Sequence, residues 1–290
     1  MSINYKLYGM NQKETTEYVK EYLTARQIRF YMYRGNIISI RYKNSPMFSA
    51  HMDTVDEDAM STKKLLSYAD YLFRDDAILG ADDKAGVNLI LNNCENINFV
   101  LTVNEERGAI GSSDLVKFEN FKNLLKKYNI NSCIVLDRKG NSDIIGTENN
   151  YCNSDFEDKI AEILSPLRYK KARGVFSDAD SFNSLVPCVN LSIGYYNHHT
   201  KSEYLNIAEF KAINNFIIKL HDGLQNLEFT LPEQFDWYDY LVKSRLKNDS
   251  SLKKYVSKEP FLDSVKDKDL IIDNMTEEEI DELYKLLYTF

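Results

Sequence analysis

Five short polar segments, far apart in the chain, hold most of the residues that could do chemistry. Three of the four histidines lie in them, and every segment carries an aspartate or a glutamate. The segments are Ala50–Thr54, Gly80–Gly86, Asn104–Glu106, Leu136–Arg138, and His198–Thr200 with Glu203. Imidazole nitrogen and carboxylate oxygen are the ligands that zinc takes where no thiolate is present. The segments therefore predict a metal site.

The charge of these side chains suits a pair of zinc ions. Three ligating carboxylates, two neutral imidazoles and a bridging hydroxide together balance the charge of two divalent cations. Two metals about 3.5–4 Å apart lower the pKa of a shared water and clamp the attacking and leaving oxygens. A carboxylate outside the ligand set can take the water proton and pass it to a leaving amine. Adjacent glutamates such as Glu105 and Glu106 suit that division of labour.

Each polar segment follows a predicted strand, so the strands must position the site. Apolar runs predict strands at 37–42, 46–50, 99–103, 133–136, 143–145 and 189–193. Helical spacing predicts helices at about 12–28, 84–93, 113–128, 155–165 and 207–222. The alternation predicts an α/β fold, a three-layer α/β/α sandwich with a mixed, mostly parallel central sheet. Ligands of open α/β sheets bind beyond the carboxyl ends of the strands, where these segments can converge.

Two helix ends carry capping signals. Asn11 followed by Glu14 resembles a capping box at the start of the first helix. Asn206 and Glu209 open the helix at 207–222, and Gly223 is expected to close it.

In this order the segments resemble the signature of the di-zinc exopeptidase clan, which includes bacterial aminopeptidases, tripeptidase T and related amidohydrolases. The Gly80–Gly86 segment looks most like tripeptidase T, and the match runs from about Gly35 to Glu203. The resemblance implies two Zn²⁺, with Co²⁺ or Mn²⁺ as substitutes, and a peptide or N-acyl amino acid substrate. It implies that Asp82 bridges both metals, that His51 and Asp137 complete one site, and that Glu106 and His199 complete the other.

The resemblance also implies roles for residues outside the ligand set. Glu105 is expected to be the general base, and Asp53 is expected to orient His51 through a hydrogen bond. The peptide bond between Asp82 and Asp83 is expected to be strained and can be cis. Glu105 and Asp53 therefore stand as the expected catalytic residues.

Three alternatives remain open within these segments. Asp82 or Asp83 could instead cap the helix that follows them. His198 competes with His199 for the metal, although the His199-Thr-Lys-Ser-Glu203 spacing favours His199. Ser177-Asp178 either caps a helix that begins at about Ala179 or belongs to the substrate cleft, and the sequence favours neither role over the other.

The spacing leaves no room for the lid or dimerisation domain of larger clan members. Asp137 and His199 are 62 residues apart (199 − 137), and His51 and Asp82 are 31 apart (82 − 51). The chain thus resembles a bare catalytic domain at 1–224, and losing a lid favours a monomer. Residues 225–290 form an expected acidic extension with 9 basic and 15 acidic residues, which ends in an amphipathic helix beginning at about Thr276.

Composition narrows the class of partner and the compartment. The net charge of −8 argues against nucleic-acid and anionic-membrane partners. No apolar run reaches the roughly 20 residues of a membrane span. The four cysteines are not arranged in pairs, which predicts buried free thiols in a reducing compartment. A cytoplasmic location is expected.

The predicted function is metal-dependent hydrolysis of peptide amide bonds, most directly by an aminopeptidase. A carboxypeptidase or an N-acyl amino acid amidohydrolase would share the metal centre and differ only in the flanking pocket. A non-catalytic scaffold on a hydrolase fold is a remote alternative, because it would require a broken ligand set.

Overall fold

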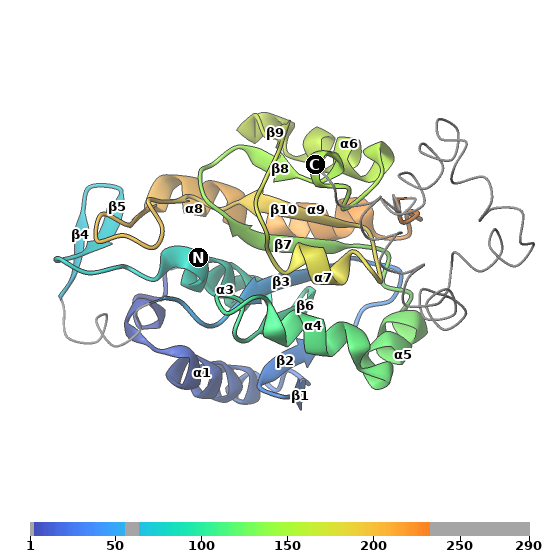
Figure 1. The fold of residues 1–290 in the computed structure, drawn as a ribbon, viewed down its shortest axis with the longest axis horizontal. Helices are drawn as coiled ribbons and strands as arrows, with labels where there is room; N and C mark the ends of the chain where they lie inside the picture. The colour runs from blue at the N-terminus through green and yellow to red at the C-terminus, as the bar shows by residue number, and fades with distance from the viewer. Residues whose placement is uncertain (1–2, 56–63, 233–290) are drawn as a thin grey trace, which may run out of the picture. The chain divides into compact units, whose positions relative to one another are not determined.

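The computed structural model describes residues 3–55 and 64–232, and an eight-stranded mixed sheet lies at the centre of this part (Figure 1). The strand order is β1-β2-β6-β3-β7-β10-β8-β9. The strands are β1 (Tyr31–Tyr33), β2 (Asn36–Ser39), β3 (Met47–His51), β6 (Asn98–Thr102), β7 (Cys133–Arg138), β8 (Asp143–Ile145), β9 (Lys170–Ala172) and β10 (Cys188–Ser192). The alternation of strands and helices thus gave the predicted α/β class.

The middle of the sheet is parallel, and this determines where the site forms. β6, β3, β7 and β10 pair in parallel, whereas β1 with β2, β2 with β6 and β10 with β8 pair antiparallel. Every residue of β3, β6 and β10 is buried. Strands covered on both faces read as continuous apolar runs, which is why the sequence identified them. Their carboxyl ends meet at one edge of the sheet.

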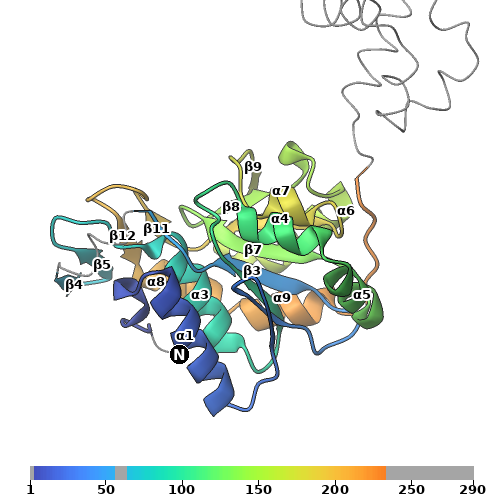
Figure 2. The ribbon, with the colours of Figure 1, turned by 60° about the horizontal axis from the view of Figure 1, so that its bottom comes forward.

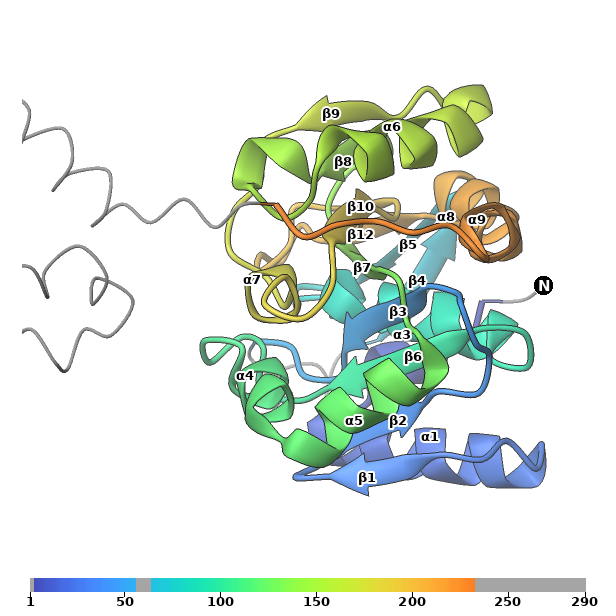
Figure 3. The same ribbon diagram turned by 90° about the vertical axis from the view of Figure 1, so that its right-hand side faces the viewer.

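Helices cover both faces, as a three-layer sandwich requires (Figures 2 and 3). One core cluster joins the sheet to α1, α3, α6, α8 and α9, and a second joins the other face to α4, α5 and α7. The helices are α1 (Gln12–Ala25), α3 (Ala81–Asn93), α4 (Ile110–Lys117), α5 (Glu119–Tyr128), α6 (Ser154–Ile163), α7 (Ala179–Phe182), α8 (Ile207–Asn214) and α9 (Ile217–Leu224). The predicted capping box at Asn11 and Glu14 is confirmed, with both reciprocal bonds formed.

Two predicted helices are each divided in the structure. The helix expected at 113–128 is two helices that meet at Phe118, whose backbone is extended and whose ring stacks on Tyr33 at 3.8 Å between centroids. The helix expected at 207–222 breaks at 215–216, between α8 and α9. Gly223 does not end α9, because it lies inside the helix where a Cβ would come within 2.8 Å of Ile163. The stacking of Phe118 on Tyr33 is a contact between elements that local periodicity does not record.

A second sheet was not predicted. Its antiparallel strands run in the order β11-β12-β5-β4, and they are β4 (Leu65–Tyr68), β5 (Tyr71–Arg74), β11 (Tyr195–Tyr196) and β12 (Tyr204–Asn206). The β4–β5 hairpin occupies the interval between His51 and Asp82, and β12 brings it against the segment that carries His199. These strands have mixed burial and short lengths, so their hydrophobic pattern was too weak to predict them.

The compact unit of the described chain runs to Pro232. Residues 225–232 continue along it, since Asn131 donates to the carbonyl of Leu227 and Phe229 packs on Phe156 at 4.8 Å between centroids. The division at 224 and 225 stays a prediction, and the expected terminal helix lies outside the described residues. No helix in the described ranges is long and apolar enough to cross a membrane. All four cysteines are free and buried, as predicted.

Candidate metal centre

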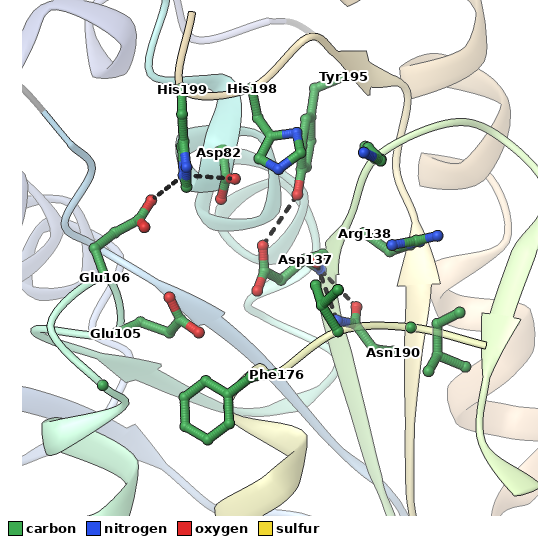
Figure 4. A pocket seen from close by; sticks show the side chains of 15 residues that line it. Asp82, Glu105, Glu106, Asp137, Arg138, Phe176, Asn190, Tyr195, His198 and His199 are labelled. Atoms are coloured by element: carbon green, nitrogen blue, oxygen red, sulfur yellow. Dashed lines mark hydrogen bonds and ion pairs between the residues drawn. The ribbon is translucent and has the colours of Figure 1, made fainter. Parts of the chain in front are cut away.

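The structure gathers all seven predicted site residues at the carboxyl edge of the parallel strands. His51 is the last residue of β3, and Asp137 is the second-last residue of β7. Glu105 and Glu106 follow β6, the parallel neighbour of β3, and His199 lies between β11 and β12. Five of the seven residues, Asp82, Glu105, Glu106, Asp137 and His199, line one pocket (Figure 4), and His51 and Asp53 lie buried behind it.

Asp82 stands between two clusters of side chains. Its Oδ1 lies 3.1 Å from His51 Nε2, which is also 3.7 Å from Asp137 Oδ1. Its Oδ2 lies 3.3 Å from His199 Nε2, which is 2.7 Å from Glu106 Oε1. The two carboxylate oxygens of Asp82 thus face the two predicted ligand pairs, one on each side, which is the arrangement expected of a bridging ligand.

The backbone around Asp82 is held in place by two buried carboxylates. Asp82 and Asp83 have non-helical dihedral angles at the start of α3, and the bond between them is cis, as the resemblance implied. Glu203, which is 1% exposed, accepts hydrogen bonds from the amides of Gly80 at 2.8 Å and Asp82 at 3.1 Å. Asp83 accepts from the amides of His51 and Gly86. These contacts favour Asp82 over Asp83 as the bridging ligand, because the carboxylate of Asp83 already accepts hydrogen bonds from backbone amides.

Asp53 has a wider part in the site than the sequence suggested. Its carboxylate lies 3.4 Å from His51 Nδ1, although the nearer acceptor for that nitrogen is the carbonyl of Asp53 at 3.1 Å. The same carboxylate accepts from the amides of Glu105 and Glu106, at 3.0 and 3.1 Å. One side chain thus fixes both the first histidine and the turn that presents the two glutamates.

Two residues that the sequence analysis missed hold Asp137. The Tyr195 hydroxyl donates to Asp137 Oδ1 at 3.1 Å. The amide side chain of Asn190 pairs with the backbone of Asp137, donating at 3.0 Å and accepting at 3.1 Å. Asn190 lies within an apolar strand, where a polar residue is a signal that could have been noticed.

The crowded carboxylates have strongly perturbed pKa values. Burial, with smaller contributions from Asp137, Asp178 and Glu106, raises the pKa of Glu105 to about 9. Burial, followed by the charge of Asp82, raises the pKa of Asp137 to about 7. Hydrogen bonds to Asp82 and Glu106 raise the pKa of His199 to about 10. Burial opposes ionisation of Asp82, but hydrogen bonds to His199 and His51 outweigh it and lower its pKa.

The donor set fits divalent cations. Asp82, Glu106 and His199 can each offer one ligand atom within 4.8 Å of the others, and this group is the second predicted metal site. His51 and Asp137 form such a group with Asp83, whereas the 3.1 Å approach of Asp82 to His51 makes Asp82 the better third member. Carboxylates so close together repel one another unless protons or cations lie between them. Oxygen and imidazole donors suit zinc, cobalt and manganese.

The remaining wall of the pocket is partly apolar and partly cationic. Apart from the carboxylates and His199, its lining residues are Gly108, Arg138, Lys139, Ile145, Gly174, Val175, Phe176, Asn190, Tyr195 and His198. His198 lies beside the ligands without the contacts of His199, its Nδ1 is buried without a partner, and burial lowers its pKa. The ion pairs thus favour His199 over His198 as the ligand.

Ser177 and Asp178 lie at the start of α7, beside the pocket but not in its lining. The Ser177 hydroxyl accepts from the amide of Ala179 at 3.3 Å, which serves the start of α7. Asp178 makes no side-chain capping bond and accepts from the Thr102 hydroxyl at 2.5 Å, at the end of β6. The preceding residues Val175 and Phe176 line the pocket, so the segment does reach the cleft.

Solved structures share this fold, although no family model and no curated protein sequence matches the chain. Aminopeptidase PepT from Bacillus cereus has a TM-score of 0.61 at 14% identity, and the match covers 76% of this chain and 96% of that one. A tripeptidase from Staphylococcus aureus gives 0.61 at 16% identity, with the same coverage. A protein named endoglucanase, from Thermotoga maritima, gives 0.53 at 11%, covering 76% and 96%. The expected fold is therefore confirmed.

Proposed function

We propose that this chain, with the fold found in aminopeptidase and tripeptidase structures, is a two-metal hydrolase of peptide amide bonds. The observation that carries the proposal is the position of Asp82, whose two oxygens face a histidine–carboxylate pair on each side. A structural ion-pair network would not need two such pairs around one carboxylate. The ligands would be His51, Asp82, Glu106, Asp137 and His199.

Two bound zinc ions would supply a water of lowered pKa and an electrophile for the scissile carbonyl. The protein would supply the proton transfers. Glu105 lines the pocket, is 9% exposed and lies 3.8 Å from His51 Nε2, next to the ligands. Its position suits a base that takes the proton of the attacking water and returns it to the leaving amine nitrogen.

Asp53 would hold Glu105 in position relative to the metals. Its carboxylate accepts from the backbone amides of Glu105 and Glu106 and approaches His51, so one side chain links the backbone of the two glutamates to the first histidine. Outer partners of metal ligands fix the orientation of the imidazole and commonly matter as much as the ligands themselves.

Replacing the base tests the proposal. Glu105→Gln should keep zinc, as measured by metal analysis, and should lose more than about 10²-fold in kcat on leucine-containing tripeptides. A Glu119→Gln variant, on the exposed start of α5, is the matched control and should keep full activity. Hydrolysis by Glu105→Gln at the wild-type rate would show that the base is assigned wrongly. Failure of the wild-type protein to retain zinc, cobalt or manganese would favour the scaffold alternative.

The proposal extends to the setting of the enzyme. The substrates would be peptides or N-acyl amino acids, in the cytoplasm, with neither nucleic acid nor membrane as a partner. The buried free thiols suit a reducing compartment. A monomer is proposed, because the intervals between the ligands hold only the short strands and helices described above.

A further inference from the structure

The acidic and the basic residues that line the pocket belong to different parts of its wall. Every carboxylate that lines the pocket, among the described residues, belongs to the proposed catalytic set: Asp82, Glu105, Glu106 and Asp137. The other charged groups of that lining, histidines aside, are Arg138 and Lys139, which follow Asp137 at the end of β7. Figure 4 shows Arg138 on the side of Asp137 that is opposite to Glu105 and Glu106.

The two cations differ in how free they are to bind a ligand. Arg138 is fixed, since its Nε and Nη2 both donate to Asp143 Oδ2, at 3.1 and 3.0 Å. That carboxylate offsets one positive charge of the wall. Lys139 is exposed and forms no ion pair within the described part of the chain, so its positive charge is not offset by a paired carboxylate. An ammonium ion of a substrate would be repelled there, whereas a carboxylate would be attracted.

An apolar surface lines the same pocket as these cations. Ile145, Val175 and Phe176 line the same pocket, and Val175 and Phe176 are 74% and 57% exposed. Gly174 lets this segment lie against β8, because a Cβ there would come within 2.7 Å of Ile145. Large exposed apolar side chains that wall a pocket typically contact a ligand. The pocket therefore offers both a group that attracts carboxylates and an apolar surface.

We propose that Lys139, beside the fixed Arg138, binds the free carboxylate of a short peptide or N-acyl amino acid whose apolar side chain contacts Val175 and Phe176. This inference rests on the proposed function and narrows its substrate class. The fragment that leaves as the amine would carry the carboxylate, so long peptides and amidated peptides would be poor substrates. The closeness of the cations to Asp137 limits how many residues can follow the cleaved bond.

Paired substrates test this assignment in the zinc-loaded full chain. Wild-type protein should cleave Leu-Gly-Gly about tenfold faster in kcat/KM than Leu-Gly-Gly amide, the ratio that one charge-assisted contact supplies. Lys139→Met should remove the preference by slowing cleavage of the free acid alone, and Lys139→Arg should restore most of it. Lys126→Met, on an exposed turn of α5, is the matched control and should keep the wild-type ratio.

Two outcomes would overturn the inference while leaving the proposed function intact. One is equal cleavage of acid and amide by the wild type, and the other is an equal loss on both by Lys139→Met. Binding provides a second readout that does not need turnover. Zinc-loaded Glu105→Gln should bind the free acid more tightly than the amide in calorimetry, and adding Lys139→Met should abolish the difference. Absence of any zinc-dependent cleavage, with this binding preference present, would refute the proposed function and keep the carboxylate site.

Discussion

Gly86, in the first full turn of α3, gives the sharpest test of how the site is packed. A Cβ at this position would lie 2.3 Å from the carbonyl oxygen of Leu136 and 2.5 Å from both carboxylate oxygens of Asp83. Ordinary contact begins near 3.4 Å, so Gly86→Ala would force α3 and β7 apart by roughly 1 Å. Leu136 immediately precedes Asp137, and Asp83 follows Asp82, so both sides of the proposed metal centre would shift.

Two opposing terms determine the size of the effect. Alanine favours the helix over glycine by about 1 kcal/mol. Overpacking a closed interior costs about 1–3 kcal/mol, and the upper end applies here because a backbone carbonyl of a central strand cannot rotate away. We therefore expect Gly86→Ala to lower the free energy of unfolding by about 2 kcal/mol. Zinc affinity should fall about tenfold, as for disturbed outer partners of metal ligands.

Urea denaturation of the metal-free protein measures the first effect through its midpoint, and calorimetric zinc titration measures the second. Gly9→Ala is the matched control, since a Cβ there meets only Arg74 at 3.7 Å and should change stability by less than about 1 kcal/mol. Stabilisation by Gly86→Ala of about 1 kcal/mol, the value of helix propensity alone, would refute the packing argument.

Two further predictions concern the metal site. Glu203→Gln should weaken zinc binding about tenfold in calorimetry, because a side-chain amide cannot accept hydrogen bonds from both backbone amides as the carboxylate does. The control is Glu209→Gln, whose carboxylate accepts from Tyr196 and Asn141 and which should keep the wild-type zinc affinity. An equal loss of zinc affinity in both variants would refute the role of Glu203. Burial raises the pKa of Glu105 to about 9. Burial and the charge of Asp82 raise the pKa of Asp137 to about 7. Between about pH 4 and 9 the folded metal-free protein therefore binds more protons than the unfolded chain. The raised pKa of His199, from its hydrogen bonds to carboxylates, acts in the same direction. Stability of the metal-free protein should therefore fall as pH rises through this range, as thermal melts with a chelator would show, and zinc should reverse the trend; a flat profile would contradict the assigned shifts.

The sequence alone predicted the candidate ligands most directly where they lie at the end of an apolar strand. His51 and Asp137 lie at the ends of buried parallel strands and the pair Glu105-Glu106 follows another, and the continuous hydrophobicity of these strands makes their ends visible. Asp82 at the start of α3 and His199 between β11 and β12 do not end a strand of this sheet. Since parallel strands place their carboxyl ends at one edge, the order of these strands was enough to predict that His51, Asp137 and the two glutamates converge. The number and type of donors then predicted a pair of cations.

The sequence did not indicate the interactions that hold these donors in place. Tyr195, Asn190 and Glu203 act through hydrogen bonds to residues 53 to 123 positions away, so the partners of these side chains cannot be read from the local sequence. The division of α4 from α5 and of α8 from α9 has the same origin, because tertiary packing outweighs helical periodicity.

The amino-acid sequence thus determined which atoms are available and at which edge of the sheet they gather. Tertiary structure alone decided that Asp82 rather than Asp83 faces both histidines, and that the free charge on the opposite wall is positive. The physical reason is distance. Hydrogen bonds and Coulomb interactions act over a few ångströms in space, and these separations exist only once the strands, the β4–β5 hairpin and the start of α3 have packed together.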